Sequence, residues 1–247
     1  MSGTVALVRS RALNAEARLS AIDWQAVREE LDGGGNAILE GLLSSDECQE
    51  TARLYERETG FRSRVIMARH GFGRGEYQYF SYPLPPLVAE LRAALYPRLV
   101  PVANRWSEAL GSELRFPEEH REFIARCHGA GQRNPTPLLL QYVTGDYNCL
   151  HQDVYGEHVF PLQVAILLSR PGHDFNGGEF VMTEQRPRMQ SRAEVIPLQQ
   201  GDGVVFTVRE RPVRGSRGVY RVNLRHGVSR IRSGRRQTLG IIFHDAT

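Results

Sequence analysis

The feature that most constrains the fold is a series of short apolar runs after residue 135, separated by Gly, Pro and Asn-Gly turns. Runs of strand length with turn residues between them predict β-structure. Their number and regular spacing favour a jelly roll or sandwich and not a parallel α/β sheet. We expect strands at about 138–143, 148–154, 162–169, 178–184, 194–197, 203–208, 219–226 and 236–244.

The first 135 residues carry mainly helical patterns. Ser44 and Glu47 have the spacing of a capping box, which predicts a helix that begins at residue 45. The spacing of apolar residues within 87–95, directly after Pro85-Pro86, predicts a second helix. A third helix is expected after Pro101, over residues 102–110. The glycines of residues 71–75 predict a loop that enters a short strand. We therefore expect one domain over 1–247, in which helical support (1–135) packs on one face of a jelly-roll core (136–247).

Composition indicates the class of protein and its compartment. Hydrophobic residues make up 41% and charged residues 24%, which is typical of a globular protein. No apolar run is long enough to span a membrane, and the N-terminus reads as a frayed or helical start and not as a signal peptide. Cys48, Cys127 and Cys149 are too few and too scattered for a disulfide framework or a zinc knuckle, which favours the cytoplasm. We expect Cys48 and Cys127 to be buried.

All 31 basic residues are Arg, and the net charge is +3. A guanidinium can bind a carboxylate or phosphate through two hydrogen bonds. A GC-rich genome would produce the same bias without selection, and a charge of +3 does not by itself indicate nucleic-acid binding.

A possible metal site begins with His151 and Asp153. Residues i and i+2 of a strand point to the same side, so the imidazole and the carboxylate converge. A third ligand is expected from His226, which shares the apolar face of its strand with Val222 and Leu224. Two imidazoles and one carboxylate with open positions are the donor set of non-haem Fe(II) oxygenases. Zinc with hydrolytic chemistry is the main alternative, and a His-x-Asp pair alone is often accidental.

Arg236 follows His226 by ten residues, on the next expected strand. It shares a face with Thr238 and Gly240, whose small side chains leave room beside the guanidinium. A buried Arg needs an anion, and the far carboxylate of a diacid would supply one. The hydroxyl of Tyr142 could donate to the same carboxylate. A solvent-exposed Arg at a strand end and an ordinary core Tyr are the competing interpretations.

The run LLLQYVTGDYNCLHQD, followed by GGEF, GDGVVF, HGVSRIRSGRR and TLGIIF, resembles the 2-oxoglutarate/Fe(II) dioxygenase superfamily over residues 138–244. The spacing from His to the basic residue is similar to the prolyl-hydroxylase-like branch, and the HQD segment with its upstream Tyr resembles the AlkB-type demethylases. The chain looks closer still to a bacterial family described as oxygenases acting on damaged DNA. The last strand reads RQTLGIIF, which departs from the Arg-x-Asn-x-Thr-Phe-Arg pattern of AlkB-type enzymes.

The resemblance implies a double-stranded β-helix fold and an enzyme. His151, Asp153 and His226 would hold Fe(II). Arg236 would anchor 2-oxoglutarate, with Tyr142 and Thr238 beside it. Such enzymes use O2 to oxidise a C–H bond and release succinate and CO2.

The substrate is the least constrained part of this interpretation. Residues 185–192 and 209–217 are rich in Arg, and Arg186 and Arg188 could contact phosphates. Tyr77, Tyr79 or Phe80 could stack on a flipped base. Three hypotheses result: an oxidative demethylase of alkylated nucleic acid with a role in DNA repair, a hydroxylase of a protein side chain or small molecule, and a non-catalytic jelly-roll metal binder or sensor. Solvated connecting loops are the plain interpretation of the Arg-rich stretches.

Overall fold

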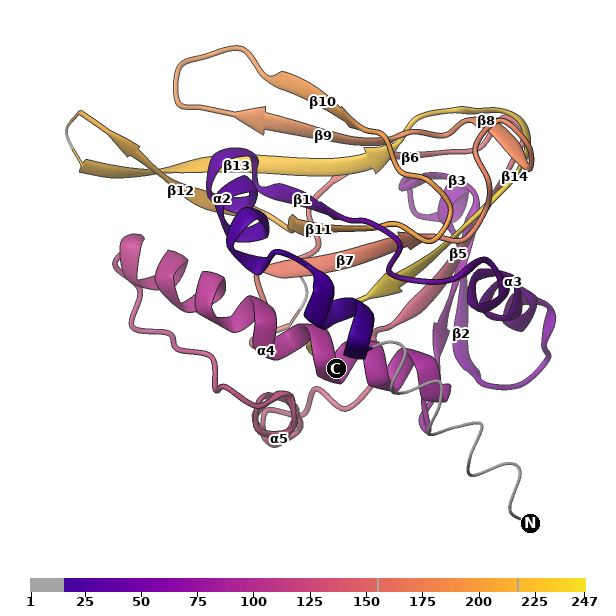
Figure 1. Cartoon of the computed structure of the whole chain (residues 1–247), viewed down its shortest axis with the longest axis horizontal. Coiled ribbons are helices and arrows are strands. Elements are labelled where there is room, and N and C mark those ends of the chain that lie inside the picture. Colours follow the sequence, from indigo (N-terminus) through magenta and orange to yellow (C-terminus); the bar gives the residue numbers. More distant parts are fainter. Residues whose placement is uncertain (1–15, 155, 217) are drawn as a thin grey trace.

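Two antiparallel β-sheets face one another in the computed structural model, which describes residues 16–154, 156–216 and 218–247 (Figure 1). The larger sheet contains, in spatial order, β1 (Asn36–Leu39), β11 (Gly203–Thr207), β7 (Leu162–Leu167), β14 (Ile231–Ile241), β5 (Leu138–Val143), β4 (Glu76–Phe80) and β2 (Phe61–Ile66), and β8 (Phe175–Gly177) pairs with β14. The smaller sheet contains β10 (Arg192–Ile196), β9 (Phe180–Gln185), β13 (Gly218–Val228), β6 (Tyr147–His151) and β3 (Gly73–Arg74), and β12 (Glu210–Gly215) pairs with β13. This architecture confirms the expected mainly β, jelly-roll class.

Helices cover the outer face of the larger sheet (Figure 1). They are α2 (Trp24–Gly34), α3 (Ser45–Arg53), α4 (Pro86–Ala109) and α5 (His120–Gly129), with 3-10 turns at Leu54–Glu56 and Met67–Arg69. The predicted capping box is present at α3, where Ser44 and Glu47 bond each other's backbone N–H groups. No helix in the described part of the chain is long and apolar enough to cross a membrane. Of the three free cysteines, Cys48 and Cys127 are buried as expected.

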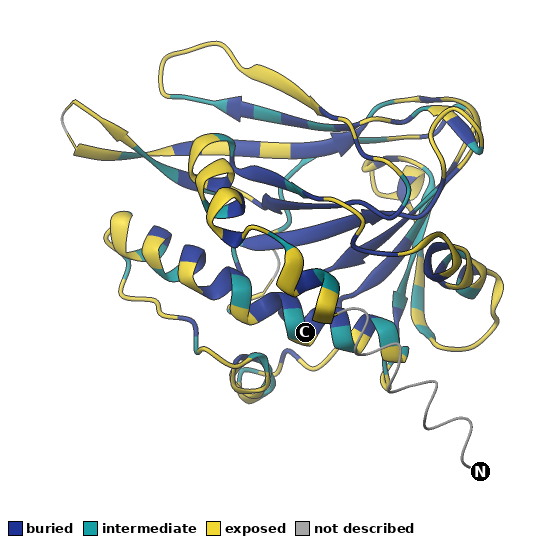
Figure 2. Ribbon diagram, viewed as in Figure 1, coloured by how far each residue is buried: buried dark blue, intermediate teal, exposed yellow. Residues whose placement is uncertain are grey.

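Two apolar cores lie on either side of the larger sheet, and both appear as buried ribbon in Figure 2. The first lies between α4 and the sheet, and the second fills the space between the two sheets. β7 contributes to both, because Val164 and Ile166 face the helices while Ala165 and Leu167 face the other sheet. A strand covered on both faces loses the polar alternation of an exposed sheet, so all six residues of β7 are buried.

The prediction of two helices between residues 87 and 110 was wrong. α4 runs unbroken through Pro97 and Pro101. Each proline removes one backbone N–H, which normally ends or kinks a helix. The buried face continues across both, from Leu91 through Leu99 to Trp106, so packing on the sheet offsets the missing hydrogen bonds.

Three strand predictions also need correction. β6 ends at His151, so Asp153 lies just beyond the strand and not within it. The Arg-rich stretch 209–217 is not a loop, because most of it forms β12, hydrogen-bonded to β13. Arg217 lies outside the described residues. The short strand expected after residues 71–75 is β4, but the first 135 residues supply further strands: β1 and β2 extend the larger sheet, and β3 borders the smaller one.

Candidate metal centre and its cavity

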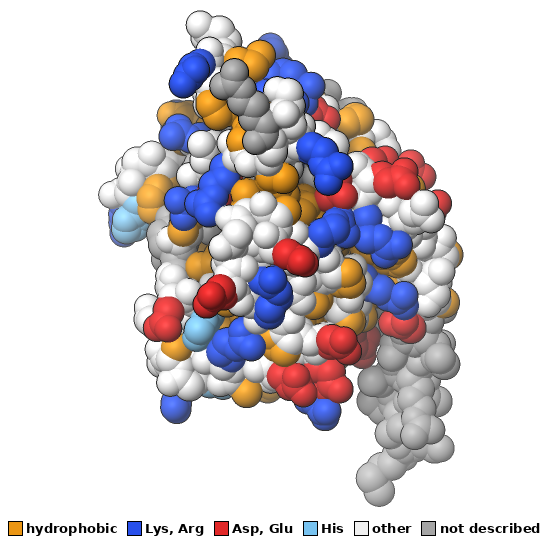
Figure 3. Space-filling view, turned by 90° about the vertical axis from the view of Figure 1, so that its left-hand side faces the viewer, with side chains coloured by type: hydrophobic (Ala, Val, Ile, Leu, Met, Phe, Trp, Pro, Cys, Tyr) orange, Lys and Arg blue, Asp and Glu red, His pale blue; other side chains and the backbone are white. Residues whose placement is uncertain are grey.

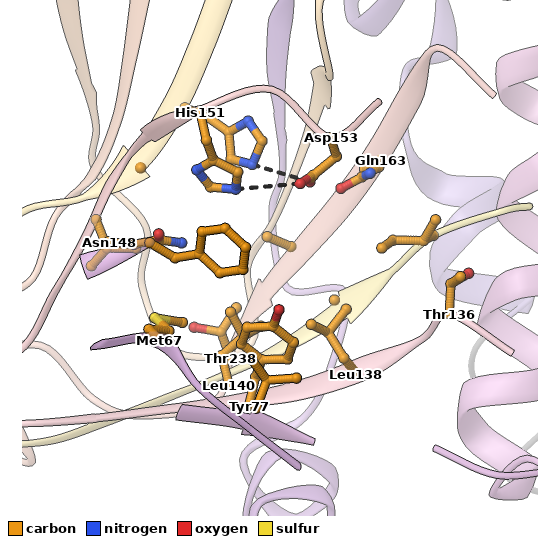
Figure 4. A pocket seen from close by; sticks show the side chains of 18 of the residues that line it. Met67, Tyr77, Thr136, Leu138, Leu140, Asn148, His151, Asp153, Gln163 and Thr238 are labelled. Atoms are coloured by element: carbon orange, nitrogen blue, oxygen red, sulfur yellow. Dashed lines mark ion pairs between the residues drawn. The ribbon is translucent and has the colours of Figure 1, made fainter. Parts of the chain in front are cut away.

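Three side chains converge between the sheets. The register of β6 and β13 places His151 directly opposite His226, with ring centroids 4.2 Å apart. The Asp153 carboxylate lies 3.4 Å from Nε2 of each histidine, Oδ1 on His151 and Oδ2 on His226 (Figure 4). The three potential ligand atoms lie within 4.8 Å of one another. One metal ion could therefore be held by all three.

The surroundings of this cluster favour the metal-binding forms of His226 and Asp153, whereas His151 differs: burial alone would lower its pKa, but the neighbouring Asp153 carboxylate outweighs burial and raises this pKa. The Nδ1–H of His151 donates to the Cys149 carbonyl at 2.8 Å, which leaves the Nε2 lone pair facing Asp153. Burial lowers the pKa of His226, which favours its neutral, ligating form. Burial alone would raise the pKa of Asp153, but the two histidine side chains, whose Nε2 atoms face the carboxylate, hold it well below its usual range.

A cavity of about 520 Å³ opens beside the cluster. Its walls come from the inner faces of both sheets and are largely apolar, as Leu138, Leu140 and Phe180 illustrate. The predicted anchor residues Arg236, Tyr142 and Thr238 line it, and so do Tyr77 and Tyr79 (Figure 4 labels Tyr77 and Thr238). Apolar walls with a few convergent polar groups are typical of a small-molecule site.

Arg236 is buried without an ion pair among the described residues. Only 2% of it is exposed, and Nη1 donates to Thr238 Oγ1 at 2.6 Å while Nε has no partner. Tyr142 lies directly opposite on β5, and its buried hydroxyl also lacks a partner. Burial lowers the pKa of Arg236 to about 10, against weaker attraction from Tyr142 and Glu179. A cation that has lost its water and found no carboxylate is an incomplete ion pair, which an anionic ligand would complete.

Space around this guanidinium depends on a glycine with a left-handed conformation. Gly178 has a φ of +66°, and a Cβ there would lie 3.0 Å from Arg236 Cδ and closer still to Ile231. A side chain at this position would displace the guanidinium or the strand that carries it.

The other predicted substrate residues fall into two groups. Tyr77 and Tyr79 lie in the cavity, packed edge to face at 5.3 Å. Phe80 does not lie in the cavity. It is 1% exposed, points to the opposite face of β4 and stacks there on Phe61 of β2. Arg186 is ion-paired with Glu184 at 2.7 Å, and neither it nor the exposed Arg188 lines the cavity. The interpretation of Phe80 as a base-stacking residue was therefore wrong.

Both Arg-rich stretches belong to hairpins, β9–β10 and β12–β13, that project to the left in Figure 1. Figure 3 shows the face at that end of the molecule, where Arg side chains are spread among hydrophobic ones.

Gln163 and His244 are polar cavity residues that were not predicted from the sequence. Gln163 is a lone polar residue in β7, and this interruption of an apolar run could have revealed it. His244 follows Arg236 by eight residues, an even number. In an extended strand both side chains would therefore lie on the same face, so the alternation along the last strand could have indicated His244.

Solved structures define the class of this fold. The chain is similar to an oxidoreductase of the 2OG-Fe(II) oxygenase family from Burkholderia pseudomallei, with a TM-score of 0.54, 15% identity, and 92% of this chain and 94% of that chain covered. It is also similar to a prolyl hydroxylase from Trichoplax adhaerens, solved with a hypoxia inducible factor peptide fragment, with a TM-score of 0.54, 16% identity, and coverage of 93% and 90%. The fold is that of the 2-oxoglutarate/Fe(II) oxygenases, whose cofactor and co-substrates are Fe(II), 2-oxoglutarate and O2.

The particular family follows from sequence comparison. Residues 75–246 match a family model described as "Oxygenase, catalysing oxidative methylation of damaged DNA". Two proteins of Mycobacterium tuberculosis, both described as uncharacterized, are 53% identical to this chain over 167 residues, which is 68% of this chain and 72% of theirs. The chain belongs to this oxygenase family.

Proposed function

We propose that His151, Asp153 and His226 bind Fe(II), that Arg236 anchors 2-oxoglutarate, and that the enzyme oxidises a methyl group on an alkylated nucleic-acid base. The observation that carries the proposal is the pairing of the three-residue cluster with a buried guanidinium that has no carboxylate, in one cavity. A zinc hydrolase needs a metal-bound water but no second anchor for a diacid. The unpaired Arg236 therefore favours 2-oxoglutarate chemistry.

Each residue has a defined task in this proposal. His151 and His226 present neutral imidazoles from paired strands, and Asp153 supplies the negative charge that favours a divalent cation. Arg236 and the Tyr142 hydroxyl bind the far carboxylate of 2-oxoglutarate, with Thr238 orienting the guanidinium. When bound, the iron supplies the activation of O2. The apolar walls exclude water from the reacting groups.

The reaction balances with O2 as the oxidant. Oxidative decarboxylation of 2-oxoglutarate to succinate and CO2 supplies two electrons, and the substrate C–H bond, which becomes C–OH, supplies the other two. On an N-methyl group the product is a hydroxymethyl amine, which breaks its C–N bond to release formaldehyde and the unmodified base. The family description and the two tyrosines of the cavity support a base as substrate. Three free thiols are consistent with a reducing cytoplasm as the place of action.

Anaerobic titration with Fe(II) and 2-oxoglutarate tests the metal and co-substrate together. We expect the metal-to-ligand absorption band, and succinate release once O2 is admitted. Asp153→Ala should abolish both, while Asp46→Ala, an exposed carboxylate on α3, should change neither. Normal succinate release by Asp153→Ala would remove it from the metal site.

The substrate is tested separately with a DNA oligomer that carries one N-methylated base. We expect formaldehyde release in step with succinate. Succinate release that methylated DNA does not stimulate would leave the oxygenase in place and refute the substrate; a protein side chain or small molecule would then be the candidate.

A further inference from the structure

Gln163 is the one polar residue of β7, and its amide is buried in the metal cavity. It is 5% exposed, and Nε2 has no hydrogen-bond partner within the described residues. Figure 4 shows its side chain beside Asp153, at the level of the metal cluster. Leaving a buried amide donor unpaired is unfavourable, so a structural role does not explain this residue. A hydrogen-bonding group of a ligand would pair it.

His244 adds a second donor to the same cavity. It is 4% exposed, and its Nδ1 accepts a hydrogen bond from the Phe160 backbone N–H at 3.3 Å. An imidazole that accepts at Nδ1 carries its proton on Nε2. Burial, together with the nearby charge of Arg92, lowers the pKa of His244 to about 4, so the ring stays neutral. Thr136 and Arg92 both bond its carbonyl, which fixes the backbone at this point.

The cavity therefore has two chemically different ends. The inner face of β14 and its extension carries Arg236 and Thr238 at one end and His244 at the other, with Gly240 and Ile242 between. The Arg236 end is cationic and suits a carboxylate. At the other end, the charge of Arg92 is paired with Asp245 at 2.7 Å, and the His244 ring that faces the cavity is neutral.

We propose that the Gln163 amide and the His244 imidazole hold the neutral hydrogen-bonding edge of the substrate base and so place its methyl group at the metal. This inference rests on the proposed function and identifies the part of the substrate that the cavity would bind through hydrogen bonds. A neutral pair of donors matches a ring carbonyl or ring nitrogen and cannot neutralise a phosphate or carboxylate. Tyr79 and Tyr77 lie in the same cavity and supply ring faces on which a planar base can stack.

Binding is the direct test, since it needs no turnover. The probe is a single-stranded DNA oligomer with one N-methylated cytosine or adenine, titrated anaerobically into the Fe(II)- and 2-oxoglutarate-loaded protein. Gln163→Leu keeps the size of the side chain and removes the amide. We expect roughly tenfold weaker binding of the methylated oligomer, because one buried neutral hydrogen bond is lost. The Kd for 2-oxoglutarate should not change.

Thermal unfolding without ligands separates a positioning role from a structural one. Removing an unpaired amide should leave the Tm of Gln163→Leu unchanged or raise it. Gln141→Leu is the matched control, because Gln141 lies in the same sheet but bonds Glu76 and Gln237 on its outer side. It should lower the Tm slightly and leave oligomer binding unchanged.

His244→Asn provides an independent variant. Asn can still accept the Phe160 N–H, but it lacks the Nε2 donor, so the fold should survive and binding of the methylated oligomer should again weaken by roughly tenfold. Variants that bind the oligomer as tightly as the wild type would overturn the inference, and so would a lower Tm with unchanged binding. A wild type that binds methylated and unmethylated oligomers equally would refute it together with the proposed substrate, while succinate release would still support the oxygenase.

Discussion

Two arginines of this protein are equally buried and differ in almost every other respect. Arg211 on β12 and Arg236 on β14 are each 2% exposed. Arg211 donates to the Glu184 carboxylate at 2.6 Å and to the carbonyls of Asp32 and Gly33 at 2.7 and 2.6 Å. Arg236 donates to one hydroxyl and has no ion pair among the described residues. Burial alone therefore does not distinguish the two arginines, whereas the missing counter-charge of Arg236 does.

The difference follows from what each guanidinium faces. Arg211 faces the last turn of α2, where backbone carbonyls lack helical partners and attract a cation. Arg92 is a further structural case, since Asp245 lies 2.7 Å from it and the two are almost fully buried. Arg236 instead faces the cavity with no carboxylate beside it among the described residues, and the Tyr142 hydroxyl opposite it also lacks a partner; an unpartnered Nε is common to Arg236 and Arg211. The protein thus supplies a carboxylate to Arg211 and Arg92, and none, within the part of the chain that the structure describes, to Arg236.

The largest expected effect is on stability. Arg211→Met should lower the free energy of unfolding by about 3–5 kcal/mol, because it leaves Glu184 as a buried charge whose remaining partners are the half-exposed Arg186 and the exposed Arg192, 4.0 Å away. Urea unfolding measures this, and the Kd for 2-oxoglutarate should not change in the folded variant. Arg221→Met is the control, since Arg221 is exposed and its 3.6 Å pair with the half-buried Glu210 should contribute about 0–1 kcal/mol. A fully stable Arg211→Met would end the distinction between the two arginines.

Arg236→Met should have the reverse profile. Removing an unpaired buried cation should leave the free energy of unfolding unchanged or raise it. Binding of 2-oxoglutarate should weaken by about 1.5–3 kcal/mol, roughly 10- to 150-fold, because a charged hydrogen bond is lost. Arg236→Lys, which keeps the charge but not the two-pronged geometry, should fall between. Unaltered co-substrate binding in Arg236→Met would dismiss the anchor.

Local alternation was enough to predict how the residues at the centre of this cavity are oriented. His226 faces inward because every second residue of β13 is buried, and Arg221 and Arg225 face out, as the pattern required. The expected proximity of Tyr142 and Arg236 is met by their direct pairing across β5 and β14. These predictions succeeded because period-two alternation fixes the face of a strand residue without knowledge of its partners.

Long-range contacts decided what alternation could not. Nothing local separates Arg211 from Arg236, since the partners of Arg211 lie 27 and 179 residues away. Phe80 follows Tyr79 directly, so alternation places it on the opposite face of β4, and the pairing of β4 with β2 and β5 decides which of the two faces meets the helical layer. The prediction of two helices in place of α4 failed for the same reason, because packing on the sheet outweighs the local helix-breaking preference of its prolines.

A smaller effect is expected at Tyr142. Tyr142→Phe should weaken 2-oxoglutarate binding by about 0.5–1.5 kcal/mol, because a neutral hydroxyl contributes less than a guanidinium to carboxylate binding. The buried hydroxyl has no partner without a ligand, so the Tm of the free protein should stay equal or rise. Isothermal titration and thermal unfolding measure the two effects. A destabilised variant with normal 2-oxoglutarate binding would make Tyr142 an ordinary core residue.

The smallest effect is expected at Arg188, which is an exposed arginine and so extends the comparison to the surface. It lies between β9 and β10 with a φ of 63°, and it has no ion pair among the described residues. Arg188→Ala should change the free energy of unfolding by no more than about 0.5 kcal/mol and leave 2-oxoglutarate binding unaltered.

If the hairpin contacts one phosphate through Arg188, the slope of log K against log salt for DNA binding should fall by about one. Arg186, already paired with Glu184, should give a smaller change in slope when replaced, because its charge is partly neutralised in the free protein. Equal slopes for wild type and Arg188→Ala would place the DNA elsewhere on the surface.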